Sequence, residues 1–346
     1  MAQDSKQKIR YKAVYIICQL PDIPVRYSCP LSLFEIPKAY FMALKFETQF
    51  DPAYGEAVAV ATDIVRVTVN NPSAFTGFGT NSYIIGTSKL AVVDPGPEDA
   101  AHFEALMRVI AGRPVSHIFV SHTHRDHSPL AARLKAETGA ITVAQGAHKA
   151  ARTLFSGEIN AFDDSSDFDF MPDICAEDGA VFISPDGTDD WGVEVIHTPG
   201  HTANHACFAL NGRGILFSAD HVMAWATTIV APPDGSMRAY MDSLEKLLKR
   251  KDELYLPGHG APISKPHRFL RGLRTHRKMR ERAVLERVMQ GDTTIPQMVA
   301  VIYRETDKRM HGAAGLSVFA HLENLVSRGL VITDGDPLPD GTFYPA

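Results

Sequence analysis

Four strong metal-ligand candidates stand within six residues of this chain, in the stretch Ser121-His122-Thr123-His124-Arg125-Asp126-His127. Residues 115–120 before it are mostly apolar, typical of a short buried strand, and residues 129–134 after it are typical of a helix start. Imidazole and carboxylate groups are the ligands that zinc and related divalent ions take. A His-rich polar loop is the alternative explanation, but a strand-to-helix turn gives these groups a rigid base. The stretch therefore predicts a metal site at the edge of a sheet.

Length and composition indicate an ordinary globular protein. The 346 residues suffice for one large domain and a small one, with 45% hydrophobic and 22% charged residues. The net charge of −5 does not indicate a nucleic-acid binder. Cys18, Cys29, Cys175 and Cys207 are scattered without a CxxC pair, so we expect a reducing compartment and no metal role for them.

The first forty residues differ from the rest of the chain. Basic residues between positions 6 and 12 precede an apolar run, 13–20, that is too short to span a bilayer and lacks a signal-peptide cleavage site. We expect a cytoplasmic protein without a membrane segment. We also expect residues 1–41 to be an upstream extension without its own fold, with Met42 as the natural start. A peptide from residues 1–41 found in the native protein by mass spectrometry would contradict this.

From residue 57 onward, strands and helices alternate, which predicts α/β layering. We expect strands at 57–69, 82–86, 89–93 and 141–144, and helices at 98–111 and 129–138. Three further strands, 193–196, 214–217 and 253–256, lead into segments that carry His201, Asp220 and His259. Because the ends of strands gather functional groups at one edge of a sheet, we expect these segments to converge on 122–127.

Two loops interrupt this alternation. Residues 153–190 contain eleven acidic residues and neither lysine nor arginine, and we expect a long, solvated acidic surface with a strand at 180–183. The Gly-rich loop 75–81 either approaches a substrate closely or serves only a tight turn.

The last eighty residues have the opposite charge. Residues 265–346 carry thirteen lysines and arginines against nine acidic residues, a net charge of +4 that leaves −9 for the rest. Helices at 266–290, 295–304 and 313–327, followed by a hairpin within 330–344, predict a winged-helix-like domain. Six arginines of the first helix form a broad patch that either follows a phosphate backbone or is a solvated face: Arg268, Arg271, Arg274, Arg277, Arg280 and Arg282.

At residues 55–264 the chain resembles the metallo-β-lactamase superfamily. The resemblance rests on Asp94 after a strand, the HxHxDH stretch, His201 in Thr-Pro-Gly-His, Asp220 at a strand end and His259 in Pro-Gly-His-Gly. Loop 71–81 and the winged-helix-like tail are most similar to the lactamase-beta-like-2 group, and glyoxalase II, a thioesterase, is a close second. The resemblance implies an αββα sandwich in residues 42–264, followed by a small, mainly helical domain in 265–346.

The resemblance also implies two divalent metal ions, with Zn²⁺ expected and Mn²⁺ or Fe as alternatives. By position, the first ion would be bound by His122, His124 and His201, and the second by Asp126, His127 and His259. Asp220 would bridge the ions, and Asp94 would orient the ligands. Asp126 and Asp220 would then share in catalysis by a metal-bridging hydroxide.

Other histidines are weaker candidates. His205 lies four residues after His201 and either contacts the substrate, assists proton transfer or is a packed residue. We expect His117, His197 and His221 to be structural. Ser121 and Thr123 alternate with the ligands and are expected to support the loop by hydrogen bonds.

The motifs indicate hydrolysis of an acyl or phosphoryl compound and leave the substrate open. The first hypothesis is an endoribonuclease acting on single-stranded RNA, and the alternative is a small-molecule acyl hydrolase for a thioester or lactone. A third is a nucleic-acid-binding or scaffold protein whose metal site is a relic. A secreted β-lactamase is disfavoured because no export signal is convincing, and flavodiiron relatives carry Glu at the position of His124. The tail could equally form a homodimer interface or cover the groove.

Overall fold

The computed structural model describes residues 44–185 and 191–346. The expectation for residues 1–41, together with Cys18 and Cys29, falls outside the described residues. No helix within the described ranges is long and apolar enough to cross a membrane.

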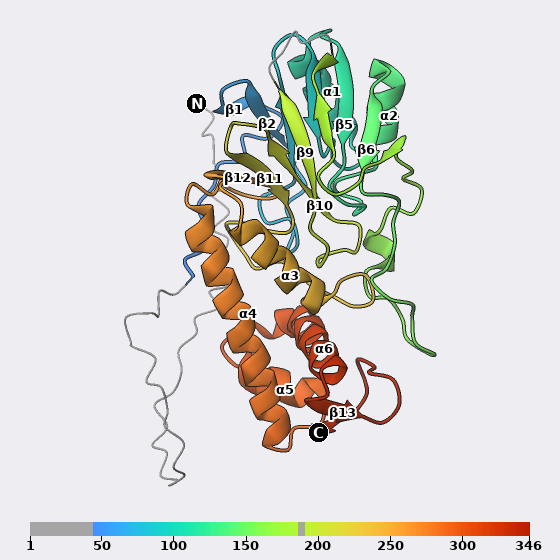
Figure 1. Ribbon diagram of the computed structural model, residues 1–346, viewed down its shortest axis with the longest axis vertical. Helices are drawn as coiled ribbons and strands as arrows, with labels where there is room; N and C mark the ends of the chain where they lie inside the picture. Colours follow the sequence, from blue (N-terminus) through green and yellow to red (C-terminus); the bar gives the residue numbers. More distant parts are fainter. Residues whose placement is uncertain (1–43, 186–190) are drawn as a thin grey trace, which may run out of the picture.

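Two sheets form the large domain (Figure 1). The first contains seven strands in chain order: β1 (Val58–Ala61), β2 (Ile64–Thr68), β3 (Asn81–Ile85), β4 (Leu90–Val93), β5 (Val115–Phe119), β6 (Ile141–Ala144) and β7 (Ile174–Cys175). The second has the order β12 (Leu254–Pro257), β11 (Ile215–Ala219), β10 (Ala206–Leu210), β9 (Gly192–His197) and β8 (Val181–Ile183). Neighbours pair in parallel from β4 to β7 and between β11 and β12, and antiparallel elsewhere.

Apolar side chains from both sheets meet in a central core that includes Phe119, Phe208 and Phe217. Helices α1 (Ala100–Ile110) and α2 (Leu130–Thr138) cover the outer face of the first sheet. Helix α3 (Met237–Leu248) covers the outer face of the second sheet. This confirms the predicted αββα sandwich, in which each sheet buries one face against the other sheet and one against helices.

One strand of the second sheet and the helix that covers this sheet were not predicted. Strand β10 and helix α3 both lie in stretches that the sequence analysis left unassigned. The signal for α3 was present, because Tyr240, Leu244 and Leu247 recur at helical spacing and are buried, and the Ser236 hydroxyl accepts a hydrogen bond from the backbone N–H of Ala239 at 3.3 Å.

The C-terminal part contains α4 (Pro266–Met289), α5 (Ile295–Ile302), α6 (His311–Ser327) and a hairpin of β13 (Val331–Thr333) and β14 (Phe343–Pro345). Helix α4 runs from the sandwich into this part (Figure 1). Leu270 and Leu273 in its first half pack into the core under the second sheet, whereas Val284 and Val288 pack with α5 and α6. One continuous helix therefore joins the two cores rigidly.

Candidate metal centre

The predicted ligand segments meet at one edge of the sandwich. Asp94 follows β4, residues 122–127 follow β5, His201 follows β9, and Asp220 follows β11 directly. The turn carrying His259 follows β12 and pairs with the first sheet, because the Asn81 side chain donates to the carbonyls of Pro257 at 3.1 Å and Gly260 at 3.0 Å. Asn81 thus ties the two sheets together beside the site.

The first group of ligand atoms consists of His122 Nε2, His124 Nδ1 and His201 Nε2. The two Nε2 atoms each lie 3.0 Å from His124 Nδ1. The His201 Nδ1–H donates to the Ile229 carbonyl at 2.6 Å, which leaves a lone pair on its Nε2. The Ser121 hydroxyl donates to Asp94, so its oxygen accepts from the His122 Nδ1–H at 2.9 Å, and the His122 Nε2 also keeps its lone pair. Unprotonated nitrogens therefore converge on one point.

The second group consists of Asp126, His127 and His259. The His127 Nδ1–H donates to Asp94 Oδ2 at 3.0 Å, and the His259 Nδ1–H donates to the Gly79 carbonyl at 3.1 Å. Both Nε2 atoms then lie 3.3 Å from Asp126 Oδ2. A carbonyl or carboxylate behind each imidazole fixes its tautomer, as in metal sites generally.

Asp220 lies between the two groups. Its Oδ1 lies 3.3 Å from His259 Nε2 and 3.5 Å from His127 Nε2, and its Oδ2 lies 3.7 Å from His201 Nε2. Within the described chain, neither the buried Asp220 Oδ1 nor the buried His127 Nε2 makes a hydrogen bond. Buried polar atoms need partners, so this convergent set of imidazole and carboxylate atoms fits divalent metal ions, one per group with Asp220 between them.

The two groups of ligands differ in the pKa values of their histidines. Burial, with added repulsion from His201, lowers the pKa of His124 to about 3, and burial lowers that of His201 too. Burial also disfavours the charge on His259, but the Asp220 and Asp126 carboxylates outweigh it and raise its pKa to about 10. The Asp126 and Asp220 carboxylates together likewise outweigh burial at His127 and raise its pKa well above the usual value. Without metal, the second group therefore holds protons that a metal ion would displace.

Backbone geometry positions these side chains. Asp94 and Ala219 both have left-handed backbones, with φ of 49° and 42°, which is costly for residues other than glycine. Gly200 lies so close to α3 that an added Cβ would be 2.4 Å from the Cα of Tyr240. The glycine before His201 thus lets α3 pack directly on the loop that carries this ligand.

The remaining histidines lie outside the ligand groups. His205 is fully buried, its Nδ1 is 2.9 Å from the Thr198 hydroxyl, and its ring centroid lies 5.2 Å from that of His122. His205 therefore packs beside the ligands, its Nε2 makes no hydrogen bond within the described chain, and a catalytic role for it stays a prediction. His221 is also buried and packs on Tyr240, the His117 ring stacks on Phe119 of β5, and His197 Nε2 lies 2.8 Å from the Ala176 carbonyl, as expected for structural residues.

Thr123 supports the ligand loop by hydrogen bonds, as expected, but its partners were not predicted. The buried Thr123 hydroxyl accepts from the Asn204 amide at 2.9 Å and lies 3.0 Å from His148 Nδ1. His148 Nε2 in turn lies 3.7 Å from Asp234 Oδ1. These residues hold the backbone between His122 and His124, and single polar residues in loops carry no sequence pattern that could have shown it.

The described part of the acidic segment, residues 153–185, is only partly a solvated surface, which corrects that expectation, and residues 186–190 lie outside the described residues. Ser166 and Asp167 are buried, and residue 166 pairs with His124 as an isolated β-bridge. The Ser165 carbonyl accepts from the Arg125 N–H at 2.9 Å, and the Asp167 carboxylate accepts from Ser128 at 2.6 Å. This segment therefore forms one wall of the ligand loop.

The arginines of α4 are largely engaged within the protein. Arg277 is buried and donates to the Thr228 carbonyl, and Arg274 is paired with Glu245 at 3.0 Å. Arg280 donates to the Ile302 carbonyl at 3.3 Å, and Arg282 pairs with Glu286 at 2.7 Å. Arg274, Arg277 and Arg280 are therefore held within the protein, whereas Arg271 and Arg282 stay exposed.

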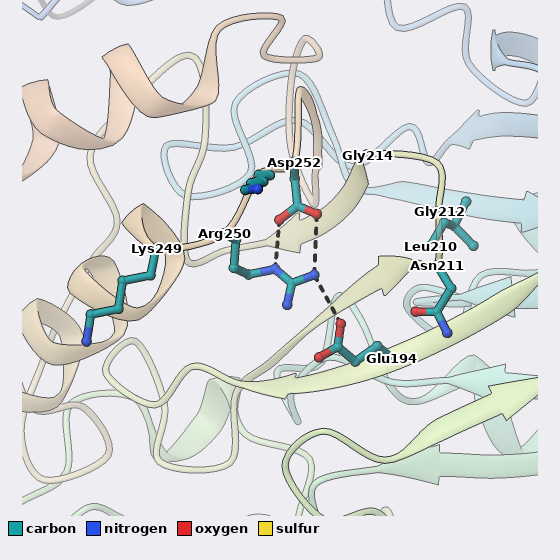
Figure 2. A pocket seen from close by; sticks show the side chains of 9 residues that line it. Glu194, Leu210, Asn211, Gly212, Gly214, Lys249, Arg250 and Asp252 are labelled. Atoms are coloured by element: carbon teal, nitrogen blue, oxygen red, sulfur yellow. Dashed lines mark hydrogen bonds and ion pairs between the residues drawn. The ribbon is translucent and has the colours of Figure 1, made fainter.

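A separate hollow of about 460 Å³ lies at the other end of the strands β9 to β12. Figure 2 shows Arg250 there between the carboxylates of Asp252, at 2.7 Å, and Glu194, at 3.1 Å. Its charge is already neutralised, and the hollow is remote from the metal ligands.

Comparison with known proteins agrees with this geometry. Residues 75–259 match the metallo-beta-lactamase superfamily and residues 294–341 match the beta-lactamase-associated winged helix domain. The beta-lactamase-like protein 2 homolog of Drosophila melanogaster is 30% identical over 287 residues, which cover 78% of this chain and 90% of the relative. An atrochrysone carboxyl ACP thioesterase of Paecilomyces divaricatus is 29% identical, covering 61% of this chain and 60% of the relative. A beta-lactamase domain protein from Burkholderia ambifaria shares the fold, with a TM-score of 0.68 at 20% identity, over 86% of this chain and 95% of the other.

The fold and the ligand set define a metal-dependent hydrolase with a C-terminal winged helix domain. The chain belongs to the metallo-beta-lactamase superfamily.

Proposed function

We propose that this protein is a metal-dependent acyl hydrolase that cleaves thioesters of small molecules. The observation that carries the proposal is the surface beside the ligands, which is aromatic and acidic. Phe162 lies 6.4 Å from His124 between ring centroids and contacts Phe75, and Asp163 and Asp164 directly follow Phe162. Such a surface suits an uncharged apolar acyl group and repels a polyanion. A relative named as a thioesterase supports the same class.

The residues that would hold the ions are His122, His124 and His201 for one, Asp126, His127 and His259 for the other, and Asp220 between them. Bound divalent ions would supply an activated water and polarise the acyl carbonyl. We propose Zn²⁺, because histidine and carboxylate donors suit it, with Mn²⁺ and Fe as the alternatives.

The chain's own groups would then orient the metal ligands and exchange protons with solvent. Asp94 holds His127 by a hydrogen bond, and Thr80 donates to Asp126 Oδ2 at 3.1 Å. The Asp126 side chain is 25% exposed against 10% for Asp220, so proton exchange with solvent would pass by Asp126. The acyl carbon gains the water oxygen and loses sulfur, giving a carboxylate and a thiol, and the remaining proton of the water passes to solvent. A thiolate, with a usual pKa of about 8.5, leaves without a dedicated acid.

Single-stranded RNA remains the second candidate substrate, favoured by the winged helix domain match at 294–341. Arg125, exposed on the ligand loop, is a cation that a phosphate could contact. However, the engagement of Arg274, Arg277 and Arg280 within the protein weakens the support that the sequence suggested for a backbone-binding track. We further propose a cytoplasmic protein, where the exposed Cys175 thiol would stay reduced.

Side-by-side assays test the proposal. Zinc-loaded protein is incubated with a 2-naphthoyl thioester of N-acetylcysteamine and, separately, with unstructured RNA, beside a His122→Ala control. Thiol release that disappears in the control supports the proposal. RNA cleavage that disappears in the control, without thiol release, would establish the second candidate instead.

A further inference from the structure

Two segments form opposite lips of the metal centre. The first is loop 73–80, anchored to the ligands by the hydrogen bond from Thr80 to Asp126 at 3.1 Å and by the Gly79 carbonyl, which accepts from His259. The second is segment 159–168, anchored by Ser165 and Ser166 to the backbone of Arg125 and His124. Each lip is thus fixed to a different group of ligands.

One aromatic side chain from each lip meets the other. The rings of Phe75 and Phe162 are 6.0 Å apart between centroids and nearly perpendicular, at 81°. Phe162 is half-buried and stands 6.4 Å from the His124 ring, whereas Phe75 is 50% exposed. The pair therefore combines contact with a ligand at one end and access to solvent at the other.

The first lip is shaped to keep Phe75 in this place. The Ser73 and Thr76 hydroxyls are 2.9 Å apart, and Thr76 donates to the Asn71 carbonyl at 2.6 Å. Gly77, with φ of 58°, lies against Trp225, which an added Cβ would approach to 2.9 Å. An exposed aromatic ring held by a tightly bonded turn beside the ligands is available to an apolar ligand, because covering the ring from water is favourable.

We propose that Phe75 and Phe162 form the acyl-binding wall of this enzyme and select aromatic or other bulky apolar acyl groups. The inference rests on the proposed thioester hydrolysis and names its substrate class. Edge-to-face and stacked contacts with these two rings would hold an aromatic acyl group with its carbonyl toward His124. Short acyl groups such as acetyl would reach the metal centre without touching the pair.

The test compares acyl groups on one thiol. Steady-state kinetics with acetyl and 2-naphthoyl thioesters of N-acetylcysteamine are measured for the parent protein, Phe162→Ala, Phe75→Ala and a Met289→Ala control, whose side chain is 64% exposed at the far end of α4. Apolar pockets discriminate one methylene by roughly 10- to 200-fold, so removal of either ring should lower kcat/KM for the naphthoyl thioester at least about tenfold. The acetyl thioester and the control should change less than about twofold.

Binding gives a second readout that does not depend on turnover. Calorimetric titration of zinc-loaded protein with 2-naphthoate should show a Kd that rises at least about fivefold in Phe162→Ala and Phe75→Ala, with unchanged zinc content. Equal losses for acetyl and naphthoyl substrates, or an unchanged Kd, would overturn the acyl-binding wall while leaving thioester hydrolysis in place. Naphthoate binding that depends on both rings, in a protein that cleaves no thioester, would uphold the wall and refute the proposed function.

Discussion

Replacement of Asp94 by asparagine tests how the ligands are oriented. The buried carboxylate accepts three hydrogen bonds: Oδ1 from the Ser121 N–H at 2.7 Å, and Oδ2 from the Ser121 hydroxyl at 2.7 Å and from His127 Nδ1–H at 3.0 Å. Asparagine has the same shape but presents an NH₂ group on one side. In either orientation, at least one donor then faces another donor.

The magnitude follows from the two orientations. If the NH₂ group faces the Ser121 N–H, one buried donor is left unsatisfied, which costs about 1–3 kcal/mol of stability. If it faces His127, the imidazole must accept at Nδ1 and carry its proton on Nε2, the atom that faces Asp126 and Asp220. Loss of such an orienting partner typically lowers metal affinity 10- to 100-fold.

Zinc affinity is measured by competition with a fluorescent chelator, and stability by urea unfolding of the metal-free protein. Asp99→Asn is the matched control, since Asp99 caps α1 by accepting from the His102 N–H at 2.7 Å and asparagine caps equally well. We expect Asp94→Asn alone to bind zinc more weakly, to be less stable, or both, according to the orientation of the amide. Unchanged zinc affinity together with unchanged stability would refute the orienting role.

Three further perturbations probe other parts of the centre. Gly258→Ala should lower zinc affinity at least about tenfold, because the new Cβ would lie 2.6 Å from Asp220 Oδ1. Arg152→Met should destabilise the fold by about 3 kcal/mol, because Arg152 donates to Glu158 and Glu323 at 2.6 Å and its loss leaves their carboxylates unpaired. Amide hydrogen exchange should then become faster both in residues 150–163 and in α6. The pKa of His259 in the metal-free protein is raised to about 10, so zinc must displace a proton from this residue. Zinc affinity should therefore increase with pH between pH 6 and 8. Calorimetry in buffers of different ionisation enthalpy should show release of about one proton or more.

The controls follow from the same contacts. Gly312→Ala adds a methyl group to α6 where nothing lies within 4 Å, and it should leave zinc affinity unchanged. Exchange that rises only in 150–163 after Arg152→Met would contradict a link between the acidic segment and α6. Zinc affinity that is independent of pH would contradict protonated imidazoles in the metal-free centre.

The sequence pattern predicted α/β layering and the convergence of the ligand segments, and the family resemblance supplied the αββα sandwich. Strand-to-loop transitions after β5, β11 and β12 carry charged or imidazole side chains in short motifs, and such local patterns specify which edge of a sheet the ligands share. Strand β10 was missed, because all five residues Ala206–Leu210 are buried and a short apolar run has no alternation to show.

The remaining features of the site depend on contacts between residues far apart in the sequence, which the sequence could not predict. Nothing local to Thr123 indicates that His148, 25 positions later, lies beside its hydroxyl. The spacing of Arg277 suggested a basic patch, but only the packed structure shows that its guanidinium is buried against the Thr228 carbonyl. Phe75 and Phe162 are similarly distant in sequence and meet only because both lips are anchored to the metal ligands.

The most direct test of the account is thiol release from the 2-naphthoyl thioester as zinc is added stepwise to metal-free protein. We predict that activity saturates at about two equivalents of zinc, as expected for the two ligand groups joined by Asp220, and is absent from His122→Ala. Protein that carries two zinc ions and leaves the thioester intact would contradict the central claim.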